Sequence, residues 1–129
     1  MGYGAHMNIT NNRPGTITTY VNNVQCMYQD GDSNSYLNDF NDCEIGSGGT
    51  YPGGQGAYIE AKDSDTCFFQ SAQFTIKVCD SNNSIIGNVS FSDDTHSWKL
   101  SDNTNPDVID VDINNDQNPG TIAITVAAS

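Results

Sequence analysis

Residues 74–91 read FTIKVCDSNNSIIGNVSF and contain two short segments in which apolar and polar residues alternate. The side chains expected on the inner face recur at every second position: Phe74, Ile76, Val78, Ile85, Gly87, Val89 and Phe91. Thr75 and Lys77 are expected to face solvent. Between the segments, residues 81–84 read Ser-Asn-Asn-Ser and favour a turn. The stretch therefore predicts two antiparallel β-strands with one buried face.

The same pattern recurs along the chain at a spacing of about ten residues, with turn-forming residues between the repeats. Further inward-facing positions are Ala57, Ile59, Ala61, Ile109, Val111, Ile113, Ile122, Ile124 and Val126, and a weaker set is Ile17, Thr19 and Val21. This order predicts an all-β fold, a single antiparallel β-sandwich. It argues against a parallel sheet with crossover helices.

The composition favours the same fold class. Fourteen of the 16 acidic residues are Asp, and the chain also has 16 Asn and 12 Gly, which favour turns over helix interiors. The 129 residues, 36% of them hydrophobic, suffice for one domain, which we expect over residues 8–129. Residues 1–7, MGYGAHM, resemble an expression leader that ends at a cloning-site Met, and the expected strands do not include them.

The net charge of the chain limits the classes of partner that it can bind. Four Lys and Arg against 16 Asp and Glu give a net charge of −12, and no basic patch is present, so nucleic acid is not an expected partner. A membrane partner should present a neutral or zwitterionic head group, because an anionic leaflet would repel the protein. No apolar run reaches the ~18 residues of a membrane span. No charged and then apolar secretion signal opens the chain.

Residues 29–56 interrupt the alternation and are rich in Asp, Asn, Ser and Gly. Long structureless segments are uncommon in compact domains and are often functional. The alternative is that Cys43, Glu44 and Ile45 form a short edge strand, which would divide the segment into two ordinary loops. The sequence is compatible with both interpretations.

The four cysteines, Cys26, Cys43, Cys67 and Cys79, allow three disulfide pairings, and their spacing does not match a paired C-x-x-C zinc site. Cys67 and Cys79 flank a possible turn around Ser71 and could face each other across a hairpin, which would leave Cys26 with Cys43. Two disulfides would fit a secreted or extracellular-acting protein. The alternative is four reduced thiols in a cytosolic protein.

No catalytic site is expected. Outside residues 1–7 the one imidazole is His96, which lies among hydroxyl and carboxylate side chains in residues 92–98. Such residues form turns, and adjacency in sequence does not produce a catalytic triad. Glu44 and Glu60 are too isolated to suggest a glycosidase pair. The sequence therefore predicts a non-enzymatic protein with no required cofactor.

Oxygen-rich segments raise calcium binding as an alternative. Residues 30–35 begin like an EF-hand loop, but Ser35 replaces the required Gly and Asn41 replaces the bidentate Glu. Residues 38–42, Asn-Asp-Phe-Asn-Asp, resemble the calcium-binding stretch of calcium-dependent fucose- and mannose-binding bacterial lectins. That resemblance implies a carbohydrate-binding β-sandwich with the calcium ligands Asp30, Asp32, Asp39, Asn41 and Asp42. A solvated acidic face is the other explanation of these residues.

A broader resemblance covers most of the chain. The segments that carry it follow one another in the order found in the aegerolysins, a family of small acidic β-sandwiches: residues 8–12 (NITNN), 15–18 (GTIT), 21–24 (VNNV), 51–53 (YPG), 58–61 (YIEA), 74–80 (FTIKVCD), 86–91 (IGNVSF), 97–98 (SW) and 119–126 (PGTIAITV). The Trp-Asp-Cys-Pro-Trp-Gly segment of fungal members has no counterpart here, where only Trp98 lies nearby.

This resemblance implies a binder of membrane lipid with sphingolipid-type head groups. It also implies the small component of a two-component pore-forming, hemolysin-like toxin, whose larger partner is a membrane-attack-type protein. Aromatic residues at strand ends or in turns are the candidates for lipid contact, because amphipathic rings suit a membrane interface. These candidates are Tyr20, Tyr28, Tyr36, Tyr51 and Trp98. The alternative for Tyr20 and Trp98 is a place in the core. Phe68, Phe69, Phe74 and Phe91 are instead expected in the core.

Overall fold

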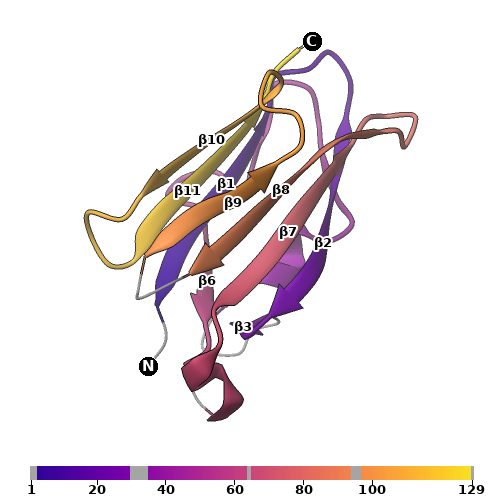
Figure 1. Ribbon diagram of the computed structural model, residues 1–129. Helices are drawn as coiled ribbons and strands as arrows, with labels where there is room; N and C mark the ends of the chain where they lie inside the picture. The colour runs from indigo at the N-terminus through magenta and orange to yellow at the C-terminus, as the bar shows by residue number, and fades with distance from the viewer. Residues whose placement is uncertain (1–2, 30–34, 64, 94–96, 129) are drawn as a thin grey trace.

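The structure of the protein, a computed structural model, describes residues 3–29, 35–63, 65–93 and 97–128. The described residues form two β-sheets and two short 3-10 segments (Figure 1). In chain order the elements are β1 (Gly4–Asn11), β2 (Ile17–Gln25), β3 (Met27–Tyr28), η2 (Leu37–Phe40), β4 (Cys43–Ile45), β5 (Thr50–Tyr51), β6 (Ala57–Ala61), η3 (Asp65–Phe69), β7 (Ala72–Cys79), β8 (Ile85–Asp93), β9 (Trp98–Asn103), β10 (Ile109–Asn114) and β11 (Gly120–Val126). The all-β prediction is confirmed.

Sheet A is mixed. Its strands follow the order β10-β11-β1-β6-β3, and β5 also pairs with β1. β1 and β11 run parallel, from Ala5 opposite Gly120 to Asn11 opposite Val126, whereas the other pairs of this sheet are antiparallel. The prediction of purely antiparallel pairing is therefore wrong here. Alternation shows which face is buried and not the strand direction, and the intervening chain makes the long connection that a parallel pair needs.

Sheet B is antiparallel, with the order β4-β2-β7-β8-β9. The predicted pair of strands in residues 74–91 is confirmed, since β7 and β8 pair with Phe74 opposite Phe91. Cys43–Ile45 is the edge strand β4, so the alternative interpretation of residues 29–56 is the correct one for this segment.

Residues 4–7 are not part of the predicted strands, but they form the first half of β1. They pair on one side with β11 and on the other with β6, and the side chains of Ala5 and Met7 are fully buried. The alternation of Ala5, Met7 and Ile9 therefore continues one strand, and β1 lies in the middle of sheet A.

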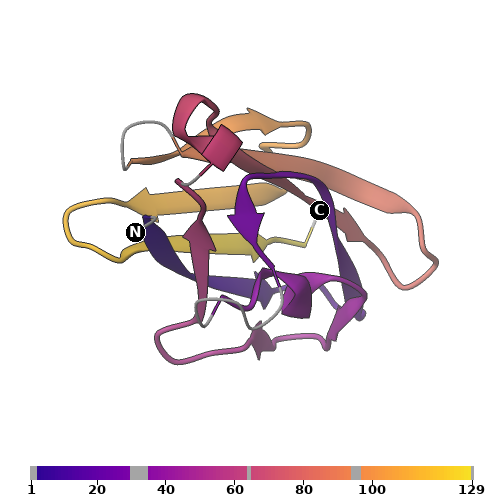
Figure 2. The same ribbon diagram turned by 90° about the horizontal axis from the view of Figure 1, so that it is seen from below.

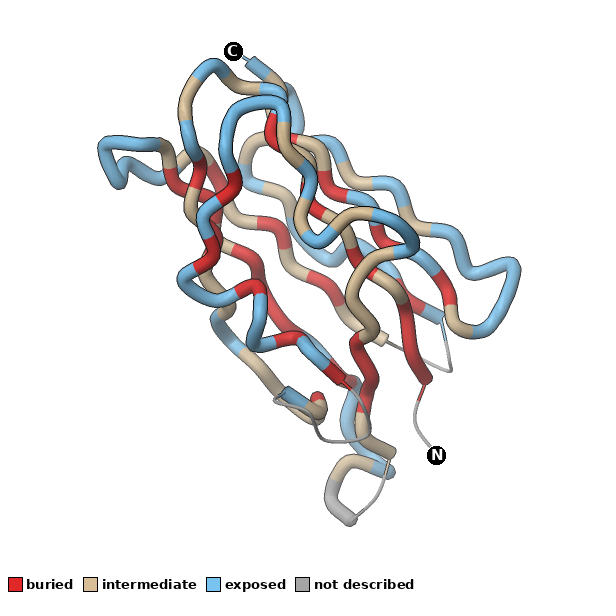
Figure 3. The backbone as a smooth tube through the Cα atoms, turned by 180° about the vertical axis from the view of Figure 1, so that it is seen from behind, coloured by how far each residue is buried: buried red, intermediate tan, exposed pale blue. Residues whose placement is uncertain are grey.

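Both sheets contribute side chains to one hydrophobic core. Buried and exposed residues alternate along the strands (Figure 3). The largest fully buried side chains come from sheet A, sheet B and η2, and they include Phe40, Phe74, Phe91, Met7, Ile59 and Ile124. Because the strands bury one face in this shared core, the apolar periodicity occurs in many separate segments of the sequence.

Ile85 departs from its expected place, because its side chain is 62% exposed. β7 and β8 are out of step at this point: Gly87 lies opposite Val78, but Ile85 lies opposite Cys79. A bulge of this kind adds one residue to a strand and reverses the alternation beyond it. Ile85 therefore shares the outer face with Cys79.

Thr75 was expected to face solvent. It lies on the outer face of sheet B, but its side chain is buried. Its hydroxyl oxygen lies 2.8 Å from that of Ser90 and accepts a hydrogen bond from Asn23 Nδ2 at 3.4 Å. The period-two pattern placed Thr75 on the correct face, but it could not show that neighbouring strands cover that position.

Candidate functional site

The most exposed large hydrophobic side chains of the described chain are adjacent. Phe68 is 70% exposed and Phe69 is 93% exposed, and their ring centroids lie 6.5 Å apart. Both follow Cys67 in η3, which lies at the same end of the molecule as the N-terminus (Figure 1); Figure 2 looks onto this end. The expectation that they belong to the core is wrong. Exposed aromatic clusters of this kind mark contact surfaces.

A disulfide fixes the base of this segment. Cys67 is bonded to Cys26, which directly follows β2. The predicted pairs, Cys67 with Cys79 and Cys26 with Cys43, are wrong, and Cys43 and Cys79 are free and buried. β7 runs without a turn from Ala72 to Cys79. A strand of that length spans about 26 Å, which places Cys79 far from η3.

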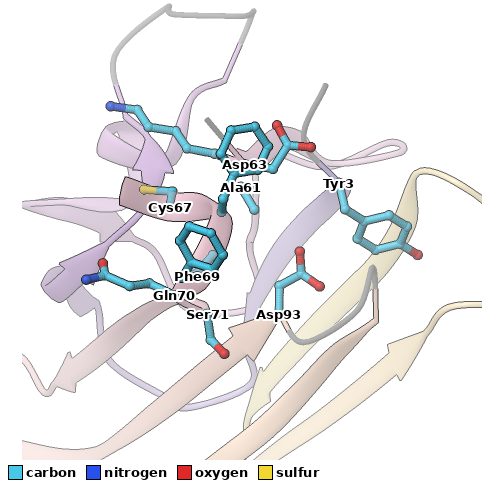
Figure 4. Close-up of a pocket in the computed structure, with 11 residues that line it drawn as sticks. Tyr3, Ala61, Asp63, Cys67, Phe69, Gln70, Ser71 and Asp93 are labelled. Carbon is cyan, nitrogen blue, oxygen red and sulfur yellow. The ribbon is translucent and has the colours of Figure 1, made fainter. Parts of the chain in front are cut away.

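A pocket of about 380 Å³ lies beside the two phenylalanines (Figure 4). Its lining combines aromatic, charged and amide side chains: Tyr3, Lys62, Asp63, Phe68, Phe69, Gln70 and Asp93. Tyr3 immediately precedes β1, Asp93 ends β8, and the other residues lie in the segment from β6 to β7. No sequence motif predicts this set, because its members are separated by up to 90 positions along the chain.

Three charged side chains line the pocket, namely Lys62, Asp63 and Asp93. Asp93 Oδ1 accepts a hydrogen bond from the Ser97 N–H, which holds the carboxylate in place. Burial and the negative charge of Asp93 raise the pKa of the Tyr3 phenol above its ordinary value of 10.0. The lining therefore offers carboxylates and aromatic rings to a cationic group and an ammonium group to an anionic one.

Two of the predicted aromatic residues, Tyr28 and Tyr36, lie near one another. Ser35, which precedes Tyr36, donates its hydroxyl proton to the Tyr28 carbonyl at 2.7 Å. Lys62 Nζ lies over the Tyr28 ring, 5.3 Å from its centroid. Tyr36 is 42% exposed. Tyr28 is thus linked through Lys62 to the segment that lines the η3 pocket.

The other three predicted aromatic residues do not join them. Tyr20 lies on sheet B with Lys77 Nζ 4.9 Å from its ring centroid. Tyr51 is half-buried and packs edge-on against Phe40. Trp98 is 2% exposed and contacts Phe74 in the core. The five candidates therefore form no single surface, and Trp98 presents almost no ring area to a ligand.

The predicted calcium ligands are only partly described. Asp30 and Asp32 lie outside the described residues, as does His96. Asn41 uses its amide oxygen to accept the Val21 N–H at 3.0 Å. Over residues 3–29, 35–63, 65–93 and 97–128, no group of three or more His, Cys, Asp or Glu residues could hold a metal ion.

No protein-family model matches this chain, and no curated protein matches it. The aegerolysin-like and lectin-like resemblances are carried by the segments quoted above. Among the described residues, no helix has both the length and the apolar character needed to cross a membrane.

Proposed function

We propose that this protein is a non-enzymatic module that binds membrane lipid through the exposed end of η3. Phe68 and Phe69 enter the membrane interface, and the adjacent pocket receives part of a sphingolipid-type head group. The observation that carries the proposal is the pair of exposed phenylalanines next to a disulfide-bonded cysteine. The two sheets and their common core support a single β-sandwich, the architecture of the aegerolysins that the sequence resembles.

The two phenylalanines supply part of the binding free energy. Complete transfer of both side chains out of water would contribute about 3–6 kcal/mol. Alone, this gives a Kd weaker than about 10 μM. Selective binding therefore needs a second contact, and the pocket beside Phe69 offers it.

The charge of the pocket favours a zwitterionic head group. Asp63, Asp93 and Lys62 line it, and Tyr3 and Phe69 add aromatic faces. An ammonium group would interact with both carboxylates and rings, while the net charge of −12 disfavours anionic lipid. Phosphocholine and phosphoethanolamine head groups have this chemistry.

A larger membrane-attack-type partner and a role in a two-component toxin belong to the same proposal, and the aegerolysin resemblance supports them. The Cys26–Cys67 disulfide is compatible with an oxidising, extracellular environment. We therefore propose that the protein acts outside the cell.

Co-sedimentation with vesicles tests the proposal. One set of vesicles contains phosphatidylcholine alone, and the other contains sphingomyelin and cholesterol in addition; each is used with calcium and with EDTA. The proposal expects selective pelleting with sphingomyelin vesicles that is unchanged by EDTA. Absence of pelleting in every sample would contradict it. Calcium-dependent behaviour, with a higher melting temperature in calcium, would favour the lectin-like alternative.

A further inference from the structure

The outer face of sheet B carries a groove of about 430 Å³ that shares no lining residue with the pocket at η3. It crosses the four adjacent strands β2, β7, β8 and β9, which lie side by side in Figure 1. Its polar lining consists of amides, hydroxyls and one carboxylate: Asn23, Gln25, Gln73, Thr75, Ser90, Ser101 and Asp102. We propose that this groove binds a neutral oligosaccharide without calcium.

Irregular strand pairing forms the two walls of the groove. The register of β2 against β7 shifts between Asn22 and Gln25, and Asn23 has a positive φ of 54°. The register of β8 against β9 shifts between Ser90 and Phe91, where Ser101 is the additional residue. Bulges redirect side chains and are common next to binding sites. In this protein one bulge lies on each side of the groove floor, which β7 and β8 form.

Hydrogen bonds order the floor before any ligand binds. The hydroxyl groups of Thr75 and Ser90 are 2.8 Å apart, and Asn23 donates to Thr75. Gln25 Nε2 donates to the Ser71 carbonyl at 2.8 Å, which orients its amide. Thr75 is 6% exposed, so its rotamer is restricted by packing. A preordered set of polar groups loses less conformational entropy on binding.

The chemistry of the lining fits sugar hydroxyls. Amide and hydroxyl side chains each offer donors as well as acceptors, as sugar hydroxyls do. Asp102, the one charged lining residue, can accept two hydroxyl groups and would repel uronic or sulfated sugars. One row further along the same face, Tyr20 lies opposite Lys77 and provides an aromatic ring. The volume lies in the range of small-ligand sites.

Affinity electrophoresis tests this inference on the full chain. The protein migrates through native gels that contain mannan, galactomannan, xylan or mixed-linkage β-glucan, with EDTA throughout and with alginate as the anionic comparison. We expect retardation by at least one neutral polysaccharide and none by alginate. Failure of all the neutral polysaccharides to retard the protein would overturn the inference, as would retardation that needs calcium.

Variants of the lining residues test whether the groove is the binding site. Gln73→Ala and Asp102→Ala change exposed side chains, and each should weaken retardation about fivefold, which corresponds to the loss of one hydrogen bond. The matched control is Thr121→Ala, also exposed but on β11 of sheet A, and it should not change retardation. Equal retardation of all three variants and the parent protein would overturn the groove as the site. Because these polysaccharides carry no lipid, the result is independent of vesicle binding.

Discussion

Cys26 is disulfide-bonded to Cys67 across 41 positions of sequence, and this bond connects the end of β2 to η3. The residue after Cys67 is the exposed Phe68. The aromatic pair is therefore attached to a strand of sheet B through a covalent bond, as well as through the chain that leads into β7. A fixed aromatic tip loses less entropy on entering an interface than a free loop would.

Removal of this disulfide should lower stability and weaken vesicle binding. Closure of a loop of this length contributes about 4 kcal/mol in the chain-entropy description. We expect the Cys26→Ser/Cys67→Ser variant to lose about 2–4 kcal/mol of unfolding free energy in urea titrations. Binding to sphingomyelin vesicles should weaken at temperatures where the variant is still folded.

Two controls accompany this experiment. A reductant should destabilise the parent protein but leave the double variant unchanged. Thiol counting in denaturant should give two reactive thiols before reduction, from Cys43 and Cys79, and four after it. Four thiols in an unreduced sample from an oxidising compartment would contradict the observed pairing.

Intrinsic fluorescence should separate the core tryptophan from the membrane-facing tip. Trp98 is the single tryptophan of the chain and is 2% exposed. Its emission should therefore be that of a buried ring and should not shift when sphingomyelin vesicles are added. The Phe69→Trp variant should show a blue shift on binding, because its new ring leaves water. A blue shift of the parent protein would place Trp98 in the lipid contact.

Stability should decrease at alkaline pH. Burial raises the pKa of the Cys43 thiol above its ordinary value of 9.0, and burial together with the nearby Glu60 raises that of Tyr58 above 10.0. An acidic group whose pKa is raised in the folded protein binds more protons in the folded state than in the unfolded state. The unfolding free energy therefore falls as pH rises above the ordinary pKa of the group. Urea titrations from pH 8 to pH 11 should show a progressive loss starting near pH 9.

Tyr58→Phe is the matched variant for this pH dependence. Tyr58 donates to Glu60 Oε1 at 2.6 Å, and Glu60 is 7% exposed. The variant should be less stable by about 1–3 kcal/mol at pH 8, because the buried carboxylate loses a partner. Its stability should also fall less steeply above pH 10. An unchanged slope would contradict a raised pKa for Tyr58 in the folded protein.

The sequence predicted the strands better than the site. Each alternating segment became a strand, because burial of one face imposes period two on the side chains. The parallel pairing of β1 with β11 and the bulge that exposes Ile85 left no such signal. Phe68 and Phe69 were misassigned because apolar type alone indicates burial, whereas their exposure follows from the projection of η3 beyond β7. The pocket with Asp63 and Asp93 depends on tertiary contacts between distant segments.

Vesicle binding by variants of the two exposed phenylalanines tests the proposed lipid contact. Phe68→Ser/Phe69→Ser is compared with Ile85→Ser. Ile85 is an exposed hydrophobic residue at the start of β8, where it pairs with Cys79 at the end of β7 that is farther from η3. All three side chains are exposed, so both variants should keep the melting temperature of the parent protein. We expect the double variant to need at least about tenfold more sphingomyelin-containing lipid for half-maximal pelleting and Ile85→Ser to bind like the parent protein. Equal binding by the double variant and the parent would contradict it.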